Sequence, residues 1–134
     1  MNFPLLSHRR TLPILYASET AFESAVLPPV RFVLHRISAA RRLDLLACMG
    51  ELASQLEMLQ ASGSLDDRVQ AEALRIQIDR EYLRWGLKEL RGLEIDGVPA
   101  EAESLFERGP EDLMNEIVSR IRAECELSGE ERKN

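Results

Sequence analysis

The stretch that decides the fold is residues 82–99, which read Y-L-R-W-G-L-K-E-L-R-G-L-E-I-D-G-V-P. It holds the single tryptophan, Trp85, on the last turns of a long helical pattern. Gly92 is predicted to end that helix. The short apolar run that follows bends at Asp96-Gly97, a dipeptide typical of tight turns. We therefore expect the preceding chain to arrive here as a helix and the following chain to fold back as smaller helical pieces.

Length and composition predict one soluble domain. The chain has 134 residues, 45% of them hydrophobic and 30% charged, and it is long enough to bury a core. We expect residues 1–10 to be flexible, residues 11–127 to form a single mainly helical domain, and residues 128–134 to form a charged tail. No apolar run approaches the ~20 residues that cross a bilayer, and no secretory signal is recognisable. A cytoplasmic location without membrane contact is expected.

Charge is unevenly distributed along the chain. Before Leu43 the chain has six arginines and two glutamates, a charge of +4. The rest of the chain must therefore carry −10, which gives the net charge of −6. A basic segment of this kind can bind nucleic acid, but the acidic remainder would repel a phosphate backbone. We therefore interpret these arginines as flanking strands and opening a helix, and nucleic acid is not an expected partner.

Strand patterns occur in the first 37 residues. Residues 12–16 are predicted to form an edge strand, where Pro13 is tolerated. Residues 18–26 are predicted as one or two helical turns that Pro28-Pro29 stops. Residues 30–37 alternate with the period of a strand. Its buried face is expected to carry Val30, Phe32 and Leu34, and its solvent-facing side Arg31, Val33 and His35.

Two helices are predicted next, joined as a hairpin. Ser38 is a helix N-cap for residues 39–61, and Ser62-Gly63 ends that helix. Ser64 opens a second helix with a capping box that uses Asp67, and this helix is expected to run to Gly92. The short linker makes the helices antiparallel. The first helix carries an apolar seam with heptad spacing, formed by Leu45, Met49, Leu52, Leu56 and Leu59.

The second helix carries two apolar stripes and therefore needs two neighbours. One neighbour is the first helix, and the other is the β portion, the C-terminal helix or another subunit. Trp85 is interpreted either as a core or hinge residue whose indole N–H reaches a backbone carbonyl, or as an interface anchor. Arg80 extends past its neighbours or pairs with an acid such as Glu51 or Glu57. The first stripe holds Val69, Ala73, Ile76, Leu83, Leu87 and Leu90, and the second Leu74, Ile78, Tyr82 and Trp85.

The C-terminal third completes a mainly α (α+β) fold. Residues 93–95 are predicted to pair with residues 30–37 or 12–16, giving a sheet of two or three strands beside the long antiparallel helical hairpin. Residues 100–107 form a short helix, and Pro110 suits the first position of the last helix. That helix is expected to bury Leu113, Met114, Ile117, Val118, Ile121 and Cys125.

No residue pattern predicts catalysis. The chain lacks a phosphate-binding loop, a nucleophile elbow and a zinc-protease motif. Its carboxylates fall within helical reach of arginines, as in Glu72 with Arg75, and such pairs are typical of solvated helix faces. His35 is alone and a poor metal ligand, and Cys48 is predicted to be a small core residue. We expect no catalytic residue, no metal site and no cofactor.

Three segments carry a family resemblance: I-S-A-A-R-R-L-D-L-L at residues 37–46, W-G-L-x-x-x-x-G-L-x-I-D-G-x-P from Trp85, and S-L-F-x-x-G-P-x-x-L-x-x-E-I from Ser104, before the charged end E-E-R-K-N. From residue 30 onward this order resembles the small tail assembly chaperones of tailed phages and prophages. The resemblance implies a non-enzymatic protein of the bacterial host cytoplasm. It would bind helical segments of the tape measure protein until tail-tube subunits polymerise around it.

The pattern of the second helix suggests where such a partner binds. The expected binding stripe is Leu74, Ile78, Tyr82 and Trp85, laid against a foreign amphipathic helix. Two other functions stay open. The chain is alternatively a homo-oligomeric structural or adaptor protein of a phage-tail-like particle that uses the same stripe for self-association. A small DNA-binding regulator is the third reading, although helix-turn-helix spacing is absent.

Overall fold

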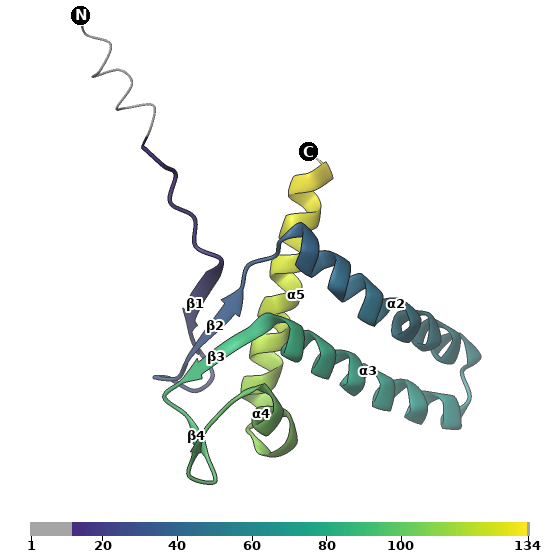
Figure 1. The fold of residues 1–134 in the computed structure, drawn as a ribbon. Helices are drawn as coiled ribbons and strands as arrows, with labels where there is room; N and C mark the ends of the chain where they lie inside the picture. The colour runs from purple at the N-terminus through teal and green to yellow at the C-terminus, as the bar shows by residue number, and fades with distance from the viewer. Residues whose placement is uncertain (1–11, 134) are drawn as a thin grey trace, which may run out of the picture.

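The computed structural model describes residues 12–133 and shows a mainly helical α+β fold, as the sequence predicts. Along the described residues, two strands are followed by two long helices, three strands and two further helices (Figure 1). The predicted flexible residues 1–10 lie outside the described residues. In chain order the elements are β1 Glu19–Glu23, β2 Arg31–His35, α2 Ala39–Ser62, α3 Leu65–Gly86, β3 Leu87–Arg91, β4 Glu94–Ile95, β5 Val98–Pro99, α4 Ala102–Arg108 and α5 Glu111–Lys133.

The main sheet has three antiparallel strands in the order β1-β2-β3. The strand predicted over residues 30–37 is confirmed as β2, its central member. Two predictions before it are wrong: residues 12–16 form no strand, and β1 replaces the helical turns expected within residues 18–26. The reason is tertiary, since β1 completes the hydrogen bonding of β2 and sets Phe22 against Phe32, with ring centroids 5.6 Å apart.

The second long helix ends at Gly86 rather than Gly92, because the residues that follow Gly86 form a strand of the sheet. Residues predicted as helix become β3, which pairs with the other side of β2 and buries Leu87 and Leu90. The predicted pairing of residues 93–95 with β2 is therefore wrong, since β3 occupies that position. Instead β4 pairs with β5 around Asp96-Gly97, whose positive φ angles of 54° and 80° fit a tight hairpin turn.

Val33 corrects another expectation, because it is buried on the face of β2 predicted to meet solvent. Lys88 of β3 forms an ion pair with Glu19 of β1. Both strands flank β2, so this pair joins the two edges and crosses the face that carries Val33. The apolar stems of long charged side chains can cover a small residue in this way.

The core lies between the inner face of the sheet and the two C-terminal helices, and we call this part the head (β1–β5, α4 and α5). Leu83 is the buried residue that α3 adds to this core. Cys125 is half-buried rather than fully enclosed, and the predicted tail from residue 128 continues the α5 backbone to Lys133. The other predicted buried residues of α5 are confirmed: Leu113, Met114, Ile117, Val118 and Ile121.

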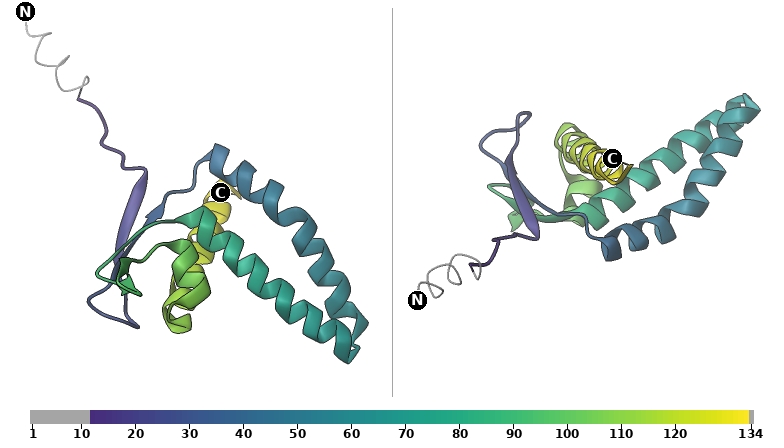
Figure 2. Two further views of the ribbon diagram at one scale, coloured as in Figure 1. Left: turned by 60° about the horizontal axis from the view of Figure 1, so that its bottom comes forward. Right: turned by 90° about the horizontal axis from the view of Figure 1, so that it is seen from above.

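The helical hairpin is confirmed, and we call α2 and α3 together the arm. The Ser38 hydroxyl accepts from the Arg41 N–H at 3.2 Å, and the Ser64 hydroxyl accepts from the Asp67 N–H at 3.1 Å. Gly63 ends α2 with a φ of 74°. The main neighbour of α2 is α3, whereas α3 also packs on α4 and α5. Figures 1 and 2 show that the linked ends of both helices project away from the head.

Candidate protein-binding surface

The predicted binding stripe faces α2. Leu74 and Ile78 are buried, and Tyr82 and Trp85 are half-buried. The Trp85 indole Nε1–H donates to the Arg41 carbonyl of α2 at 2.8 Å, and the Arg41 guanidinium lies 5.1 Å from the Trp85 ring centroid. The interpretation in which this indole reaches a backbone carbonyl is confirmed. Partner binding by these four residues stays a prediction, and for the two buried ones it would require α2 to move.

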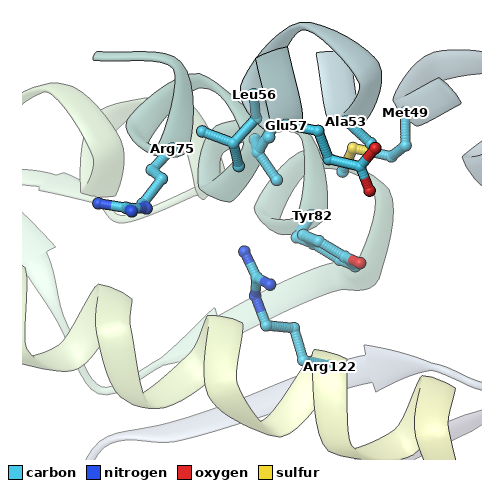
Figure 3. A pocket seen from close by; sticks show the side chains of 8 residues that line it. Met49, Ala53, Leu56, Glu57, Arg75, Tyr82 and Arg122 are labelled. Carbon is cyan, nitrogen blue, oxygen red and sulfur yellow. The ribbon is translucent and has the colours of Figure 1, made fainter. Parts of the chain in front are cut away.

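A groove of about 340 Å³ runs beside this row, between α2 and α3 and toward α5 (Figure 3). Met49, Ala53 and Leu56 line it from α2, and Tyr82 lines it from α3. At its head end the Arg122 guanidinium of α5 lies 4.5 Å from the Tyr82 ring centroid. Burial raises the pKa of the Tyr82 phenol, so this phenol stays neutral at pH 7. The groove offers apolar surface, but Arg122 partly fills its end.

The surface left uncovered on α3 is the first part of the stripe that the sequence assigned to the seam. We call Leu65, Val69 and Ile76 the outer stripe, and their exposed fractions are 70%, 64% and 45%. Seven residues make almost two helical turns, so Val69, Ile76 and Leu83 lie in one line along the helix. Leu83 is 0% exposed because the head covers that end. Both expected stripes are present on α3, but α2 covers the second stripe instead of the first, and the first stripe is left exposed in the arm.

The small residues of α3 do not distinguish the two lines. Ala71 is buried in the seam with Leu74 and Ile78, and a small side chain there lets two helix backbones approach closely. Ala73, however, gives the outer line a small side chain as well. Heptad spacing alone did not separate the lines, because both stripes repeat with helical periodicity.

A second groove opens where the outer stripe meets the head, and we call it the acidic groove. It has a volume of about 470 Å³ between α3, α4 and α5. Ile76, Phe106 and Met114 give it apolar walls. Four carboxylates also line it, and its lining contains no lysine or arginine. These carboxylates belong to Glu72, Asp79, Glu107 and Glu111.

Arg80 lies behind the acidic groove, where it pairs with Glu103 rather than with Glu51 or Glu57. It donates to Glu103 of α4 at 2.9 Å, and Arg84 donates to the same carboxylate at 2.5 Å. The Arg84 and Arg80 hydrogen bonds lower the pKa of Glu103 to about 2. The Arg80 guanidinium also lies 5.0 Å from the Phe106 ring centroid. This cluster attaches α4 to α3 and holds Phe106 in the groove.

Cys48 is exposed rather than in the core, because α2 is covered mainly on its α3 side. Residues 12–133 contain no group of three or more His, Cys, Asp or Glu side chains placed to hold a metal ion. No helix in this part of the chain is long and apolar enough to cross a membrane. No protein-family model, curated protein or solved structure matches the chain.

Proposed function

We propose that this protein is a non-enzymatic chaperone whose arm binds amphipathic helices of another protein. Following the family resemblance, that protein is the tape measure protein, bound in the host cytoplasm during tail assembly. The single observation that carries the proposal is the uncovered apolar surface of the arm. Six large apolar side chains of α2 and α3 are exposed there: Leu43, Leu46, Met58, Leu65, Val69 and Ile76.

A helix is the ligand that suits this surface. The exposed residues of α3 follow helical spacing, so a second helix can pack along them with its own apolar row. Covering apolar surface releases about 25 cal/mol for each Å² removed from water. The net charge of −6 opposes aggregation of the loaded complex. These properties support a protein that keeps the helices of another chain in solution.

Co-expression with the tape measure protein of the same genome tests the proposal. We expect the soluble yield of the tape measure protein to rise with the wild-type chain. The rise should be lost when the six exposed arm residues are replaced by serine. The control replaces two exposed apolar residues of the head, Val26 and Val98, and should act as wild type. An unchanged yield with the wild-type chain contradicts the proposed function.

Self-association is the second candidate, because apolar residues are exposed on both helices of the arm. Two arms packed together would form a four-helix bundle and cover those residues without any other protein. The chain would then be a structural or adaptor protein. Sedimentation velocity separates the two functions: a stable dimer that the same six serine substitutions dissociate favours self-association, and a monomer that binds the tape measure protein favours the chaperone.

A further inference from the structure

We infer that the bound helix lies along the outer stripe of α3, ends in the acidic groove, and carries lysine or arginine at both ends of its apolar row. This inference rests on the proposed function and names the surface and the chemistry of the partner. The observations that carry it are the graded exposure of one line of residues, a groove at its covered end, and the charge around that groove.

The first step concerns the line along α3. Exposure along it falls from 70% at Leu65 to 45% at Ile76 and 0% at Leu83. The head already packs on the last part of this line, through α4 and α5. A foreign helix on the remaining part would extend the same core outward. From Leu65 to Ile76 the uncovered part of the line is about 17 Å long at about 1.5 Å per residue, so about three turns of a partner helix can pack along it.

The second step concerns the end of the line. Ile76 belongs both to the outer stripe and to the lining of the acidic groove, so the two surfaces are continuous. Phe106 and Met114 extend the apolar surface into the head. Arg80 braces Phe106 through its position near the ring and its ion pair with Glu103. The groove is therefore a recess with apolar and acidic walls, braced at Phe106, that can receive a side chain of the partner helix.

The third step concerns charge. Two of the carboxylates in the lining have partners, since Glu72 pairs with Arg75 and Asp79 pairs with Arg122. Glu107 and Glu111 form no ion pair with another described residue.

Near the far end of the line the first turn of α3 adds Asp66 and Asp67. A helix flanked by lysine or arginine would find complementary charge at both ends, whereas an acidic helix would be repelled.

The test uses two synthetic peptides of about 20 residues, long enough to span the line as a helix of about 30 Å. Both carry the same leucine row, flanked by lysine in one and by glutamate in the other. Binding to the full-length chain is measured by fluorescence anisotropy at low and moderate salt. We expect the lysine peptide to bind at least about tenfold more tightly, a difference of about 1.4 kcal/mol, and the preference to shrink as salt screens the charges.

Variants locate the binding surface. Val69→Ser and Ile76→Ser together should weaken the lysine peptide about tenfold or more, in the range of interface hot spots. Val26→Ser with Val98→Ser removes two exposed apolar residues of the head, 50% and 63% exposed, and should bind as wild type. Because all four side chains are exposed, the variants should fold, which circular dichroism melting checks. Equal binding by Val69→Ser/Ile76→Ser and wild type overturns the inference.

A second pair of variants tests the charge. Glu107→Gln with Glu111→Gln should reduce the preference for the lysine peptide, while Glu23→Gln with Glu94→Gln, at exposed positions of the head, should leave it unchanged. An equal loss in both pairs means general attraction by net charge and overturns the assignment to the groove. If the arm solubilises the tape measure protein but the stripe variants do so equally well, this inference fails and the proposed function stands. If the tape measure protein stays insoluble with the wild-type chain, the proposed function itself fails.

Discussion

Helix α3 extends from the arm into the core of the head, and its apolar residues are exposed in the arm but buried in the head. Leu83 and Val69 lie on the same side of α3, two heptads apart, yet their exposed fractions are 0% and 64%. In the head the sheet, α4 and α5 converge on that side, whereas in the arm the main neighbour of α3 is α2, on its other side. A single amphipathic helix can therefore supply a core at one end and a binding surface at the other.

The largest expected effect comes from truncating leucines in the two regions. Leu83→Ala should lower the free energy of unfolding by about 2–5 kcal/mol, because it leaves a cavity in the head. Leu65→Ala makes the same chemical change on the same side of the same helix and should alter it by less than about 0.5 kcal/mol. Urea denaturation measures both. Similar losses in the two variants would mean that the arm surface is covered in solution.

Glycines give the next comparison. A Cβ on Gly86, where the arm enters the head, would lie 2.7 Å from the Ile121 Cδ1 atom. Ile121 is itself buried, so Gly86→Ala should destabilise the fold by about 1–3 kcal/mol.

Gly50 is the matched position in the arm, since a Cβ there meets nothing within 4 Å. Gly50→Ala should stabilise the protein by about 0.5–1 kcal/mol through helix propensity. Thermal unfolding of both variants measures these two changes in stability. A gain in stability for Gly86→Ala would show that α5 does not press on the end of α3.

A smaller effect is expected from acid at the junction of the two regions. Arg84 and Arg80 lower the pKa of Glu103 from 4.5 to about 2. A carboxylate with a depressed pKa stabilises the fold fully above its unfolded pKa, and this stabilisation disappears as pH falls from about 4.5 toward 2. Stability measured across that window should fall more steeply in wild type than in Glu103→Gln. Parallel curves would mean that Glu103 does not form these ion pairs in the native state in solution.

The smallest change is a thiol measurement that leaves the fold intact. Cys48 in the arm is exposed, whereas Cys125 in the head is half-buried and burial raises its pKa. Because the thiolate is the reactive form, Cys48 should react with Ellman's reagent several-fold faster. Single Cys→Ser variants assign the two phases. A slow Cys48 would indicate that this side of α2 is covered by another chain.

Much of the helical structure was predictable because its signals are local. Ser38, Gly63 and Ser64 act through hydrogen bonds or backbone angles within a few residues, and the bounds of α2 and the start of α3 follow from them. The turn at Asp96-Gly97 is local in the same sense. β1, β3 and the true end of α3 were missed, because each depends on pairing with β2 across the chain.

The candidate site was only half predictable for the same reason. Periodicity correctly indicated two apolar stripes on α3, but it could not say which one α2 would cover, since both repeat with the helix. Arg80 has an acid partner, as one of its two interpretations predicted, but that partner is Glu103 of α4 rather than an acid of α2.

By itself the sequence determined that two capped, amphipathic helices would lie antiparallel with more apolar surface than they can hide from each other. Only the tertiary structure decided which surface remains open, because that depends on where α4, α5 and the sheet meet α3. Caps and turns are short-range interactions that a few neighbouring residues specify. The choice between two equivalent helix faces is made by packing between segments far apart in the chain.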